Sequence, residues 1–283
     1  MFFPDQYELI DFGCGRKLER FGQYVLDRPS VAADCPQIRH GERWNQAAAR
    51  YERGESARGK WISAHELPAT WWVNHHGCTL ELRRTPFGHV GLFPEQTGNW
   101  DWLREVQAAS REPLRLLNLF AYTGGATLAA AAAGALVTHV DAARNVVSWA
   151  RRNATLSGLA DAPIRWISED ALTFVRREVR RGNHYQGVIL DPPSYGHGPK
   201  GQVWKIEQHL PNLLEACADL IAPDPRLVCL TTHTEGLSTG CLRALLVQTK
   251  VAPNSRQIET TEMSLITSDG RRLSSGRGAR WRG

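Results

Sequence analysis

Short apolar segments of this chain end directly in residues that can do chemistry. The segment Gly187–Leu190 (GVIL) runs into Asp191, which Pro192 and Pro193 follow. Proline fixes its own φ and restricts the residue before it, so the backbone at Asp191 has little freedom. A carboxylate held rigidly at the end of a buried strand is suited to presenting a group to a site.

Three other apolar segments end in residues that suit a nucleoside-shaped ligand. Gly124 and Gly125 follow the first of these segments, Leu114–Phe120, and let a ligand approach the backbone. A helix of small residues comes next, and its N-terminus offers free amide donors. Asp141 ends the second segment and can accept from ribose hydroxyls. Asp170 follows the third, where it can accept from an adenine amino group or cap the next helix. The order of these strand ends, more than any one of them, predicts a nucleoside pocket beside a rigid carboxylate.

Strands alternate with helices after residue 105, which predicts an α/β fold with a mostly parallel, Rossmann-like sheet covered on both faces. Ligands bind outside the carboxyl ends of the strands in such sheets. A hairpin formed by Ile258–Ile266 and the run to Trp281 is expected to close the sheet. The other expected strands are Leu114–Phe120, Leu136–Asp141, Ile164–Ile167, Gly187–Leu190 and Leu227–Thr231, and the expected helices are Thr127–Ala133, Ala143–Ser157, Ala171–Arg180, Lys205–Ile221 and Thr239–Lys250.

The first part of the chain has a different pattern, with short strands, tight turns and one expected helix at Trp44–Gly54. We therefore predict two domains, a small β-rich substrate-side region over residues 1–104 and a catalytic domain over residues 105–283. Asp11–Gly15 (DFGCG) looks like a second ligand loop, but bulky charged residues follow it, so we interpret it as a hairpin turn. The pair His75 and His76 offers too few ligands for a tetrahedral metal site, and no metal is expected.

The composition permits a polyanionic partner, because the formal net charge is +5. Six of the ten tryptophans lie in the first 102 residues, where they can stack on bases or pack in a core. No apolar run is long enough to span a membrane, and the N-terminus does not resemble a signal peptide, so we expect a cytoplasmic location. The six cysteines form no CxxC pair and are expected to be reduced thiols.

The segments NLFAYTGG, ARRNATLSGL, EDA and DPPSYG, together with Asp141, resemble a class I S-adenosylmethionine-dependent methyltransferase. More narrowly, they are similar to the family of bacterial ribosomal-RNA large-subunit methyltransferases that modify cytosine. The resemblance covers about residues 85–283 and includes His89–Trp100, which resembles the family's strand before the catalytic domain. It implies a seven-stranded methyltransferase sheet, S-adenosylmethionine as cofactor and RNA, particularly ribosomal RNA, as substrate.

The resemblance also implies a role for each matching position. The loop around the methionine part of the cofactor would comprise Asn118, Phe120, Ala121, Tyr122, Thr123, Gly124 and Gly125. Asp141 with Ala142 would hold the ribose, and Asp170 with Ala171 would face the adenine. Asp191, Pro192 and Pro193 would line the site next to the methyl group. Lys200, in the Gly-rich loop beyond them, is expected near a phosphate.

Two departures from that family bear on the chemistry. In the amino-methylating enzymes with this type of motif an aromatic residue stacks on the base, whereas here Ser194 directly follows the prolines and Tyr195 comes one position later, a departure that counts against stacking by Tyr195. Cytosine-C5 methylation needs a cysteine thiolate, which in the related cytosine enzymes follows the fifth strand. The residues THTEG directly after Leu227–Thr231 contain no cysteine, Cys229 lies inside the apolar strand, and Cys217 and Cys241 lie in expected helices. We therefore predict methyl transfer without a cysteine nucleophile, with His233 as candidate for a substrate-side or general-base role.

Other functions remain open on the sequence alone. A methyltransferase acting on a small molecule or a protein would keep every cofactor residue, and a non-catalytic cofactor-binding interaction protein would keep the fold. A nicotinamide dehydrogenase would also use glycines and an acid, but the full GxGxxG fingerprint is absent and Asp191–Pro193 would have no role there. A basic, aromatic face in the first part of the chain would favour RNA, whereas an enclosed apolar lid would favour a small substrate.

Overall fold

The computed structural model describes residues 2–36, 38–54, 58–63, 65–198 and 201–283. The chain forms two compact units, one of Met1–Thr97 with Ser264–Ser275 and the other of Gly98–Met263 with Gly276–Gly283. The predicted boundary between residues 104 and 105 falls inside helix α2 (Thr97–Ala108), and that domain division stays a prediction. Among the described residues no helix combines the length and apolarity needed to cross a membrane.

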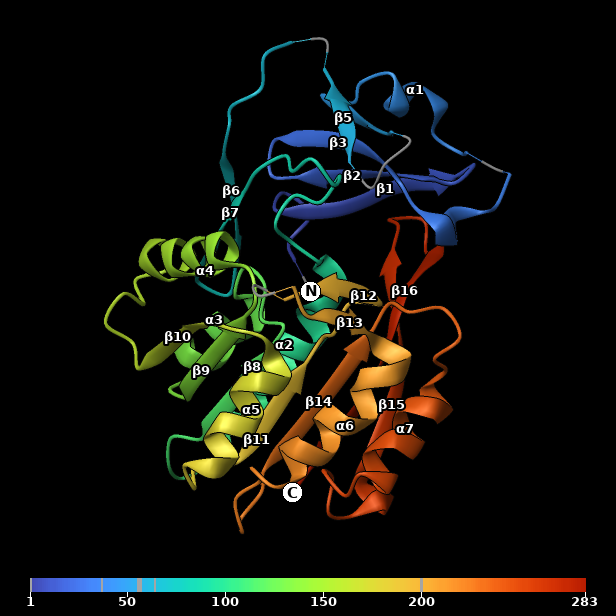
Figure 1. Cartoon of the computed structure of the whole chain (residues 1–283). Helices are drawn as coiled ribbons and strands as arrows, with labels where there is room; N and C mark the ends of the chain where they lie inside the picture. The colour runs from blue at the N-terminus through green and yellow to red at the C-terminus, as the bar shows by residue number, and fades with distance from the viewer. Residues whose placement is uncertain (1, 37, 55–57, 64, 199–200) are drawn as a thin grey trace. The chain divides into compact units, whose positions relative to one another are not determined.

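The larger sheet has seven strands in the order β10-β9-β8-β11-β14-β16-β15 (Figure 1). The five strands from β10 to β14 run parallel, and β16 pairs antiparallel with β14. This arrangement confirms the predicted Rossmann-like α/β fold and the closing pair β15–β16. The strands are β8 (Arg115–Leu119), β9 (Leu136–Asp141), β10 (Ile164–Ser168), β11 (Gly187–Leu190), β14 (Leu227–Thr232), β15 (Ile258–Ile266) and β16 (Arg272–Arg282).

Helices cover both faces of this sheet because its strands are apolar on both sides. Alternate residues of β11 show the division: Val188 and Leu190 pack into one buried cluster and Ile189 into the other. Helices α5, α6 and α7 cover the face toward the viewer in Figure 1, and α2 and α3 belong to the other cluster. The helices of this unit other than α2 are α3 (Gly125–Ala132), α4 (Arg144–Leu156), α5 (Ala171–Arg180), α6 (Ile206–Ala218) and α7 (Thr239–Gln248).

The first unit is β-rich, as predicted, with a five-stranded sheet in the order β1-β2-β3-β4-β5 and a separate pair β6–β7. Its strands are β1 (Tyr7–Gly13), β2 (Arg16–Phe21), β3 (Tyr24–Pro29), β4 (Ala49–Arg53), β5 (Gly59–Ile62), β6 (Trp71–His75) and β7 (Cys78–Leu82). Its short helices are α1 (Gly41–Trp44) and the 3₁₀ turns Val31–Ala33 and Pro94–Gln96. A third 3₁₀ turn, Ser255–Gln257, precedes β15.

Two sequence-based expectations for local structure are wrong. The helix expected at Trp44–Gly54 is the short α1 followed by strand β4, in which buried Ala49 and Tyr51 alternate with exposed residues. Pairing with β3 and β5 on both sides of β4 outweighs the helix propensity of the alanines at 47–49. The strand expected within His89–Trp100 is absent, since that segment, all of it described, contains the 3₁₀ turn Pro94–Gln96 and the start of α2.

The segment DFGCG, which resembles a ligand loop in sequence, forms a hairpin turn, as predicted. Cys14 and Gly15 have φ of 51° and 73° and join β1 to β2, and positive φ at both central residues is typical of a tight two-residue hairpin. The carboxylate of Asp11 is buried and accepts from Trp44 Nε1 at 2.9 Å and from Arg271 at 2.7 Å. Asp11 therefore holds the first unit together.

Candidate functional site

The carboxyl ends of neighbouring parallel strands lie at one level of the sheet. Leu119 of β8 pairs with Val140 of β9 and with Leu190 of β11. The ends of β9 and β11 therefore lie on either side of the end of β8 (Figure 1). Asp141 is the last residue of β9, and Asp191 directly follows β11. The strand order thus brings the predicted cofactor loop, the predicted ribose acceptor and the Asp-Pro-Pro segment to one edge.

The loop after β8 has a backbone conformation that bulky residues rarely adopt. Phe120 and Tyr122 both have positive φ, at 54° and 51°, and such strain is found mainly where function requires it. The amide of Ala121 donates to the carbonyl of Val140 at 3.1 Å, and the amide of Gly124 donates to the carbonyl of Ala121 at 3.0 Å. The loop therefore turns tightly across the ends of β8 and β9.

Gly124 and Gly125 are required in this loop for different structural reasons. Gly124 has φ +92° and precedes α3, and a Cβ on it would lie 3.2 Å from the Cβ of Ala150. A Cβ on Gly125 would overlap the indole of Trp100 on α2, so this position needs glycine for helix packing. Gly124 has no side chain to cap α3, which leaves the first amides of that helix unbonded by their N-cap residue.

Asn118, expected in the cofactor loop, lies buried beneath it. Its amide donates to the hydroxyl of Thr127 at 2.9 Å, and the same hydroxyl lies 2.9 Å from Nδ1 of His139. Burial lowers the pKa of His139 to about 3, because a charged imidazole is disfavoured where water does not reach it. These three side chains join β8, α3 and β9 under the loop.

Asp141 ties the end of β9 to the loop. Its Oδ2 accepts from the amide of Tyr122 and its Oδ1 from the amide of Ala143, each at 2.9 Å. Burial raises the pKa of Asp141, and the two backbone hydrogen bonds oppose that shift. Ala142 lies half-buried next to it. A half-buried carboxylate at this place suits the hydroxyl donors of a ribose, so the residues present fit the predicted cofactor.

Asp170 caps α5 in this structure. Its Oδ1 accepts from the amide of Thr173 at 2.9 Å and from the hydroxyl of Thr173 at 2.8 Å. Ala171 is buried at the start of the helix, and the amide of Glu169 donates to the carbonyl of Asp141. The cap fixes the end of β10 next to the end of β9, and contact of Asp170 with an adenine stays a prediction.

Asp191 is half-buried and is held by the neighbouring strand. The hydroxyl of Thr231 on β14 donates to Asp191 Oδ1 at 2.7 Å. Pro192 is buried and Pro193 exposed. The carboxylate thus has two restraints, the rigid Pro-Pro backbone after it and a side-chain hydrogen bond from β14.

The residues after the prolines form a small hairpin of β12 (Tyr195–His197) and β13 (Val203–Lys205). The hydroxyl of Ser194 bonds to that of Thr234 at 2.8 Å, which joins the segments that follow β11 and β14. Tyr195 is 55% exposed, and its hydroxyl lies 3.2 Å from Nε2 of His197. Its exposure leaves the ring accessible to a base. Lys200 lies outside the described residues.

His233 follows β14 directly and is exposed. Its Nδ1 would lie 3.0 Å from a Cβ on Gly276 of β16, so the imidazole stands close against that strand. Thr234, the next residue, bonds to Ser194 and brings this segment to the edge where Asp191 lies. The structure therefore places His233 near the predicted substrate side, and its catalytic role stays a prediction.

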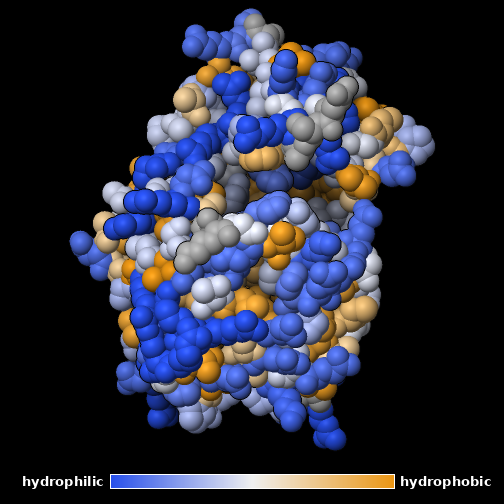
Figure 2. Space-filling model, in the orientation of Figure 1, coloured by the Kyte–Doolittle hydropathy of each residue, from blue (hydrophilic) through white to orange (hydrophobic). Residues whose placement is uncertain are grey.

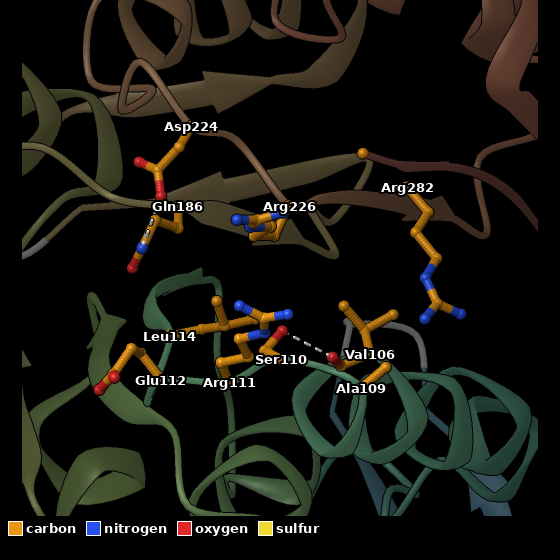
Figure 3. Close-up of a pocket in the computed structure, with 11 residues that line it drawn as sticks. Val106, Ala109, Ser110, Arg111, Glu112, Leu114, Gln186, Asp224, Arg226 and Arg282 are labelled. Carbon is orange, nitrogen blue, oxygen red and sulfur yellow. Dashed lines mark hydrogen bonds between the residues drawn. The ribbon is translucent and has the colours of Figure 1, made fainter.

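Other features of the surface do not coincide with the edge formed by the carboxyl ends of the parallel strands. A pocket of about 490 Å³ opens at the opposite end of the strands, lined by residues that precede β8, β11 and β14, among them Leu114, Gln186 and Arg226 (Figure 3). Because ligands of such sheets bind at the carboxyl ends of the strands, this pocket is not the predicted site. The surface over α5 is hydrophilic, with Arg176 and Arg180 exposed (Figure 2).

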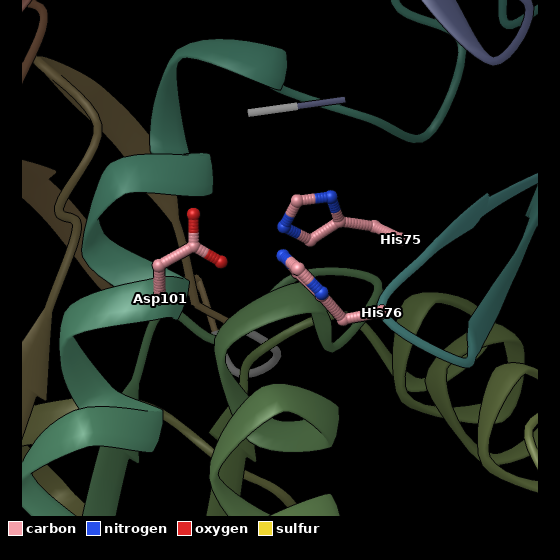
Figure 4. Close-up of side chains that lie close together, drawn as sticks. All are labelled: His75, His76 and Asp101. Carbon is pink, nitrogen blue, oxygen red and sulfur yellow. The ribbon is translucent and has the colours of Figure 1, made fainter. Parts of the chain in front are cut away.

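His75 and His76 form part of a packed turn between β6 and β7. Their ring centroids are 4.5 Å apart with the planes at 72° (Figure 4), and the ring of His75 also lies 4.7 Å from that of Phe2. Within this unit the pair supplies two imidazoles, whereas a structural zinc site takes four ligands.

Sequence reasoning missed four residues that organise the site. Thr231 orients Asp191, Trp204 of β13 donates to the carbonyl of Pro193 at 2.7 Å, and Asn153 of α4 donates to the carbonyl of Thr123 at 2.9 Å. His139 lies under the loop. An asparagine on the apolar face of α4 and a tryptophan in a Gly-rich polar segment were signals that could have identified two of them.

Comparison with known proteins gives a consistent result. A family model described as S-adenosylmethionine-dependent methyltransferase matches residues 20–242. The "Ribosomal RNA large subunit methyltransferase K/L" of Hahella chejuensis is 33% identical over 158 residues, which are 55% of this chain and 21% of that protein. The chain therefore spans about a fifth of the length of this curated relative.

Solved structures agree with the family match. The crystal structure of a SAM-dependent methyltransferase from Agrobacterium tumefaciens aligns with a TM-score of 0.92 and 38% identity, covering 98% of this chain and 90% of that chain. The structure of SMU.776, a methyltransferase complexed with SAH, aligns with a TM-score of 0.74 over 98% of this chain and 75% of that chain. Its identity is 16%, so this second likeness shows the fold alone.

Proposed function

We propose, from the premise that this chain belongs to the S-adenosylmethionine-dependent methyltransferase family, that its methyl acceptor is RNA, with ribosomal RNA the first candidate. The observation that carries the proposal is Asp191, held at the carboxyl end of β11 beside the loop after β8. The name of the Hahella relative, a ribosomal RNA large subunit methyltransferase, and the net charge of +5 support RNA over other acceptors. A ribosomal RNA substrate also supports the proposed cytoplasmic location.

The proposed mechanism assigns binding and positioning to residues of this chain. S-adenosylmethionine supplies, when bound, a methyl group on a sulfonium, which is transferred by in-line displacement. Asp191 accepts a hydrogen bond from the group that receives the methyl, and Pro192 and Pro193 keep the carboxylate from turning away. Positioning of this kind accounts for much of the rate of a two-substrate reaction. Tyr195 is proposed to contact the base and His233 to accept a proton on the substrate side.

The cofactor is proposed to lie along the edge formed by the ends of β8, β9 and β10. Asp141 holds the ribose and Asp170 the adenine, while the strained loop surrounds the methionine part. Asn118 is proposed to act indirectly, because its hydrogen bond to Thr127 fixes the start of α3 beneath the loop. The remaining proposed cofactor residues are Phe120, Ala121, Tyr122, Thr123, Gly124, Gly125, Ala142, Ala171 and Asp191.

The acceptor can be identified by offering three substrate pools to one enzyme preparation. We expect tritium from labelled S-adenosylmethionine to enter unmodified total RNA, with large-subunit ribosomal RNA labelled most strongly. Protein extract and a metabolite fraction, incubated side by side, should stay unlabelled. Label confined to protein or to metabolites would show that the acceptor is not RNA, and no label in any pool would favour a non-catalytic role.

Removal of the Asp141 carboxylate is expected to weaken cofactor binding. Asp141→Ala removes the acceptor proposed for the ribose and also two hydrogen bonds that shape the loop. A lost buried hydrogen-bonded acceptor costs about 1–3 kcal/mol, which corresponds to roughly 5- to 150-fold in Kd. Calorimetry with SAH measures this, and Asp161→Ala, an exposed carboxylate before β10, is the control that should bind normally. Equal affinities of Asp141→Ala and wild type would place the ribose elsewhere.

The two buried thiols of the second unit, Cys217 and Cys229, are poorly suited to nucleophilic catalysis. Burial raises the pKa of Cys229 to about 12, with the nearby Asp191 charge adding to the shift and Arg280 opposing it. Burial also raises the pKa of Cys217 well above its ordinary value. Because the thiolate is the nucleophile, thiols held protonated at neutral pH do not attack a pyrimidine. This supports a reaction in which neither Cys229 nor Cys217 is the nucleophile.

We accordingly expect Cys229→Ser and Cys217→Ser to keep the turnover number of the wild-type enzyme on its RNA substrate. RNA containing 5-fluorocytosine, which traps enzymes that attack C6 of cytosine, should form no covalent adduct. Denaturing electrophoresis and mass spectrometry detect such an adduct. An adduct at any cysteine would restore cytosine-C5 chemistry as the reaction.

A further inference from the structure

One buried side chain contacts the segments on both sides of the proposed reaction site. Trp204 lies on β13 and is 7% exposed. Its Nε1 donates to the carbonyl of Pro193 at 2.7 Å, and its ring centroid lies 4.8 Å from that of Phe120 in the loop after β8. Its ring centroid also lies 5.7 Å from that of His209 on α6. Trp204 thus touches the Asp-Pro-Pro segment, the loop and the helix that follows.

The hydrogen bond of Trp204 gives the small hairpin of β12 and β13 an anchor outside its own strand pairing. Strands β12 and β13 pair over three residues each and join no other strand of the described part of the chain. An isolated pair of this length is marginal at best in water. The amide of Ile206, directly after β13, also donates to the carbonyl of Ser194, the residue after Pro193, at 3.1 Å. The indole therefore anchors β13, the partner of the strand that carries Tyr195, to the rigid end of β11.

The ring contact reaches the strained loop. Phe120 has φ 54°, so its backbone adopts a conformation that surrounding contacts must stabilise. Its partly buried ring packs against the same cluster as Trp204. A ligand that fixes the conformation of this loop would therefore also stabilise the hairpin, through the contact between the rings of Phe120 and Trp204.

We propose that Trp204 is a positioning residue that couples the cofactor loop to the hairpin bearing Tyr195, so that a bound cofactor orders the substrate side of the site. The inference rests on the proposed placement of the cofactor in the loop after β8. Trp204 touches no reacting atom in this scheme. It acts through Pro193 and Phe120.

Hydrogen exchange of the backbone amides in 195–198 and 201–206 tests this without any RNA. In the wild-type chain, SAH is expected to slow exchange of these amides. In Trp204→Phe, which keeps a ring but loses the donor, exchange without ligand should rise by about 2- to 12-fold, the effect of one hydrogen bond. The further slowing by SAH should disappear, while the Kd for SAH from calorimetry changes less than about threefold, because every proposed cofactor contact remains.

Two further variants separate coupling from simple loss of structure. Trp281→Phe is the matched control, because Trp281 is also buried but its Nε1 has no hydrogen-bond partner within the described residues. It should leave hairpin exchange unchanged. Phe120→Leu removes the ring contact and keeps the indole bond, so ligand-free protection should persist and the response to SAH should be lost. This variant also tests the proposal if Trp204→Phe does not fold.

The outcomes distinguish this inference from the proposed function. Retained slowing by SAH in both Trp204→Phe and Phe120→Leu would overturn the coupling, as would equal ligand-free exchange in Trp204→Phe and wild type. If the exchange results are as expected but wild-type enzyme labels no RNA, the RNA proposal fails and the role of Trp204 stands. With an active RNA substrate, Trp204→Phe should lower kcat at saturating cofactor by about tenfold, and Trp281→Phe should not.

Discussion

Asp191→Asn is expected to lower the rate of methyl transfer by about 100-fold or more while S-adenosylmethionine affinity stays nearly unchanged. The substitution is close to isosteric. In the wild-type chain the hydroxyl of Thr231 donates to Asp191 Oδ1 at 2.7 Å, and the amide oxygen of asparagine can still accept this hydrogen bond. The position of the side chain is therefore kept and its charge is lost. A loss confined to the chemical step marks an interaction made mainly in the transition state.

Single-turnover kinetics at saturating cofactor, together with calorimetry for SAH, separate the two effects. Thr231→Val removes the restraint but leaves the carboxylate, and it should cause a smaller loss than Asp191→Asn. Pro192→Ala and Pro193→Ala keep the acid and free the backbone, so a loss of rate there would support rigidity as the function of the prolines. If Asp191→Asn instead binds cofactor poorly and turns over normally once saturated, Asp191 contacts the cofactor and not the substrate.

The second large effect concerns the stability of the fold beneath the loop. His139 has a pKa of about 3 in the folded chain and about 6.5 when exposed. Between these values the unfolded chain binds a proton that the folded chain does not, so stability falls as the pH drops below 6.5. At pH 4.5 the loss amounts to roughly 2–3 kcal/mol relative to neutral pH. Above pH 6.5 this contribution is constant.

Urea unfolding of wild type and His139→Asn at pH 7.5 and pH 4.5 isolates this contribution. Asparagine can bond to Thr127 but does not titrate, so the variant should lose clearly less stability between the two pH values than the wild type does. His139→Gln serves if the asparagine variant does not fold. A wild type and variant with the same pH dependence would mean that the imidazole can be protonated in the folded state.

The sequence predicted the catalytic sheet well because its strands are apolar on both faces and end in distinct polar residues. Leu136–Asp141, Gly187–Leu190 and Ala171–Arg180 have the predicted bounds. The first unit was harder, since its strands are short and half-exposed. In β4 the alternation of Ala49 and Tyr51 with charged residues spans only five positions and lies within an alanine-containing stretch that favours a helix.

The site was predictable where chemistry follows from residue type and position along a strand. Asp141, Gly124 and Asp191 could be placed at one edge of the sheet from the order of strands alone. The contacts that hold them come from distant parts of the chain and leave no local pattern. Trp204 reaching Pro193 and Thr231 reaching Asp191 depend on which strands become neighbours and on the turn of one small hairpin.

The most direct measurement of the central claim is a nucleoside analysis of ribosomal RNA from cells that lack this protein. We expect mass spectrometry of digested large-subunit RNA to show that one methylated nucleoside is missing at one site. Expression of the wild-type chain should restore it, and expression of Asp191→Asn to the same level should not. An unchanged set of methylated nucleosides in cells without the protein would contradict ribosomal RNA as its substrate.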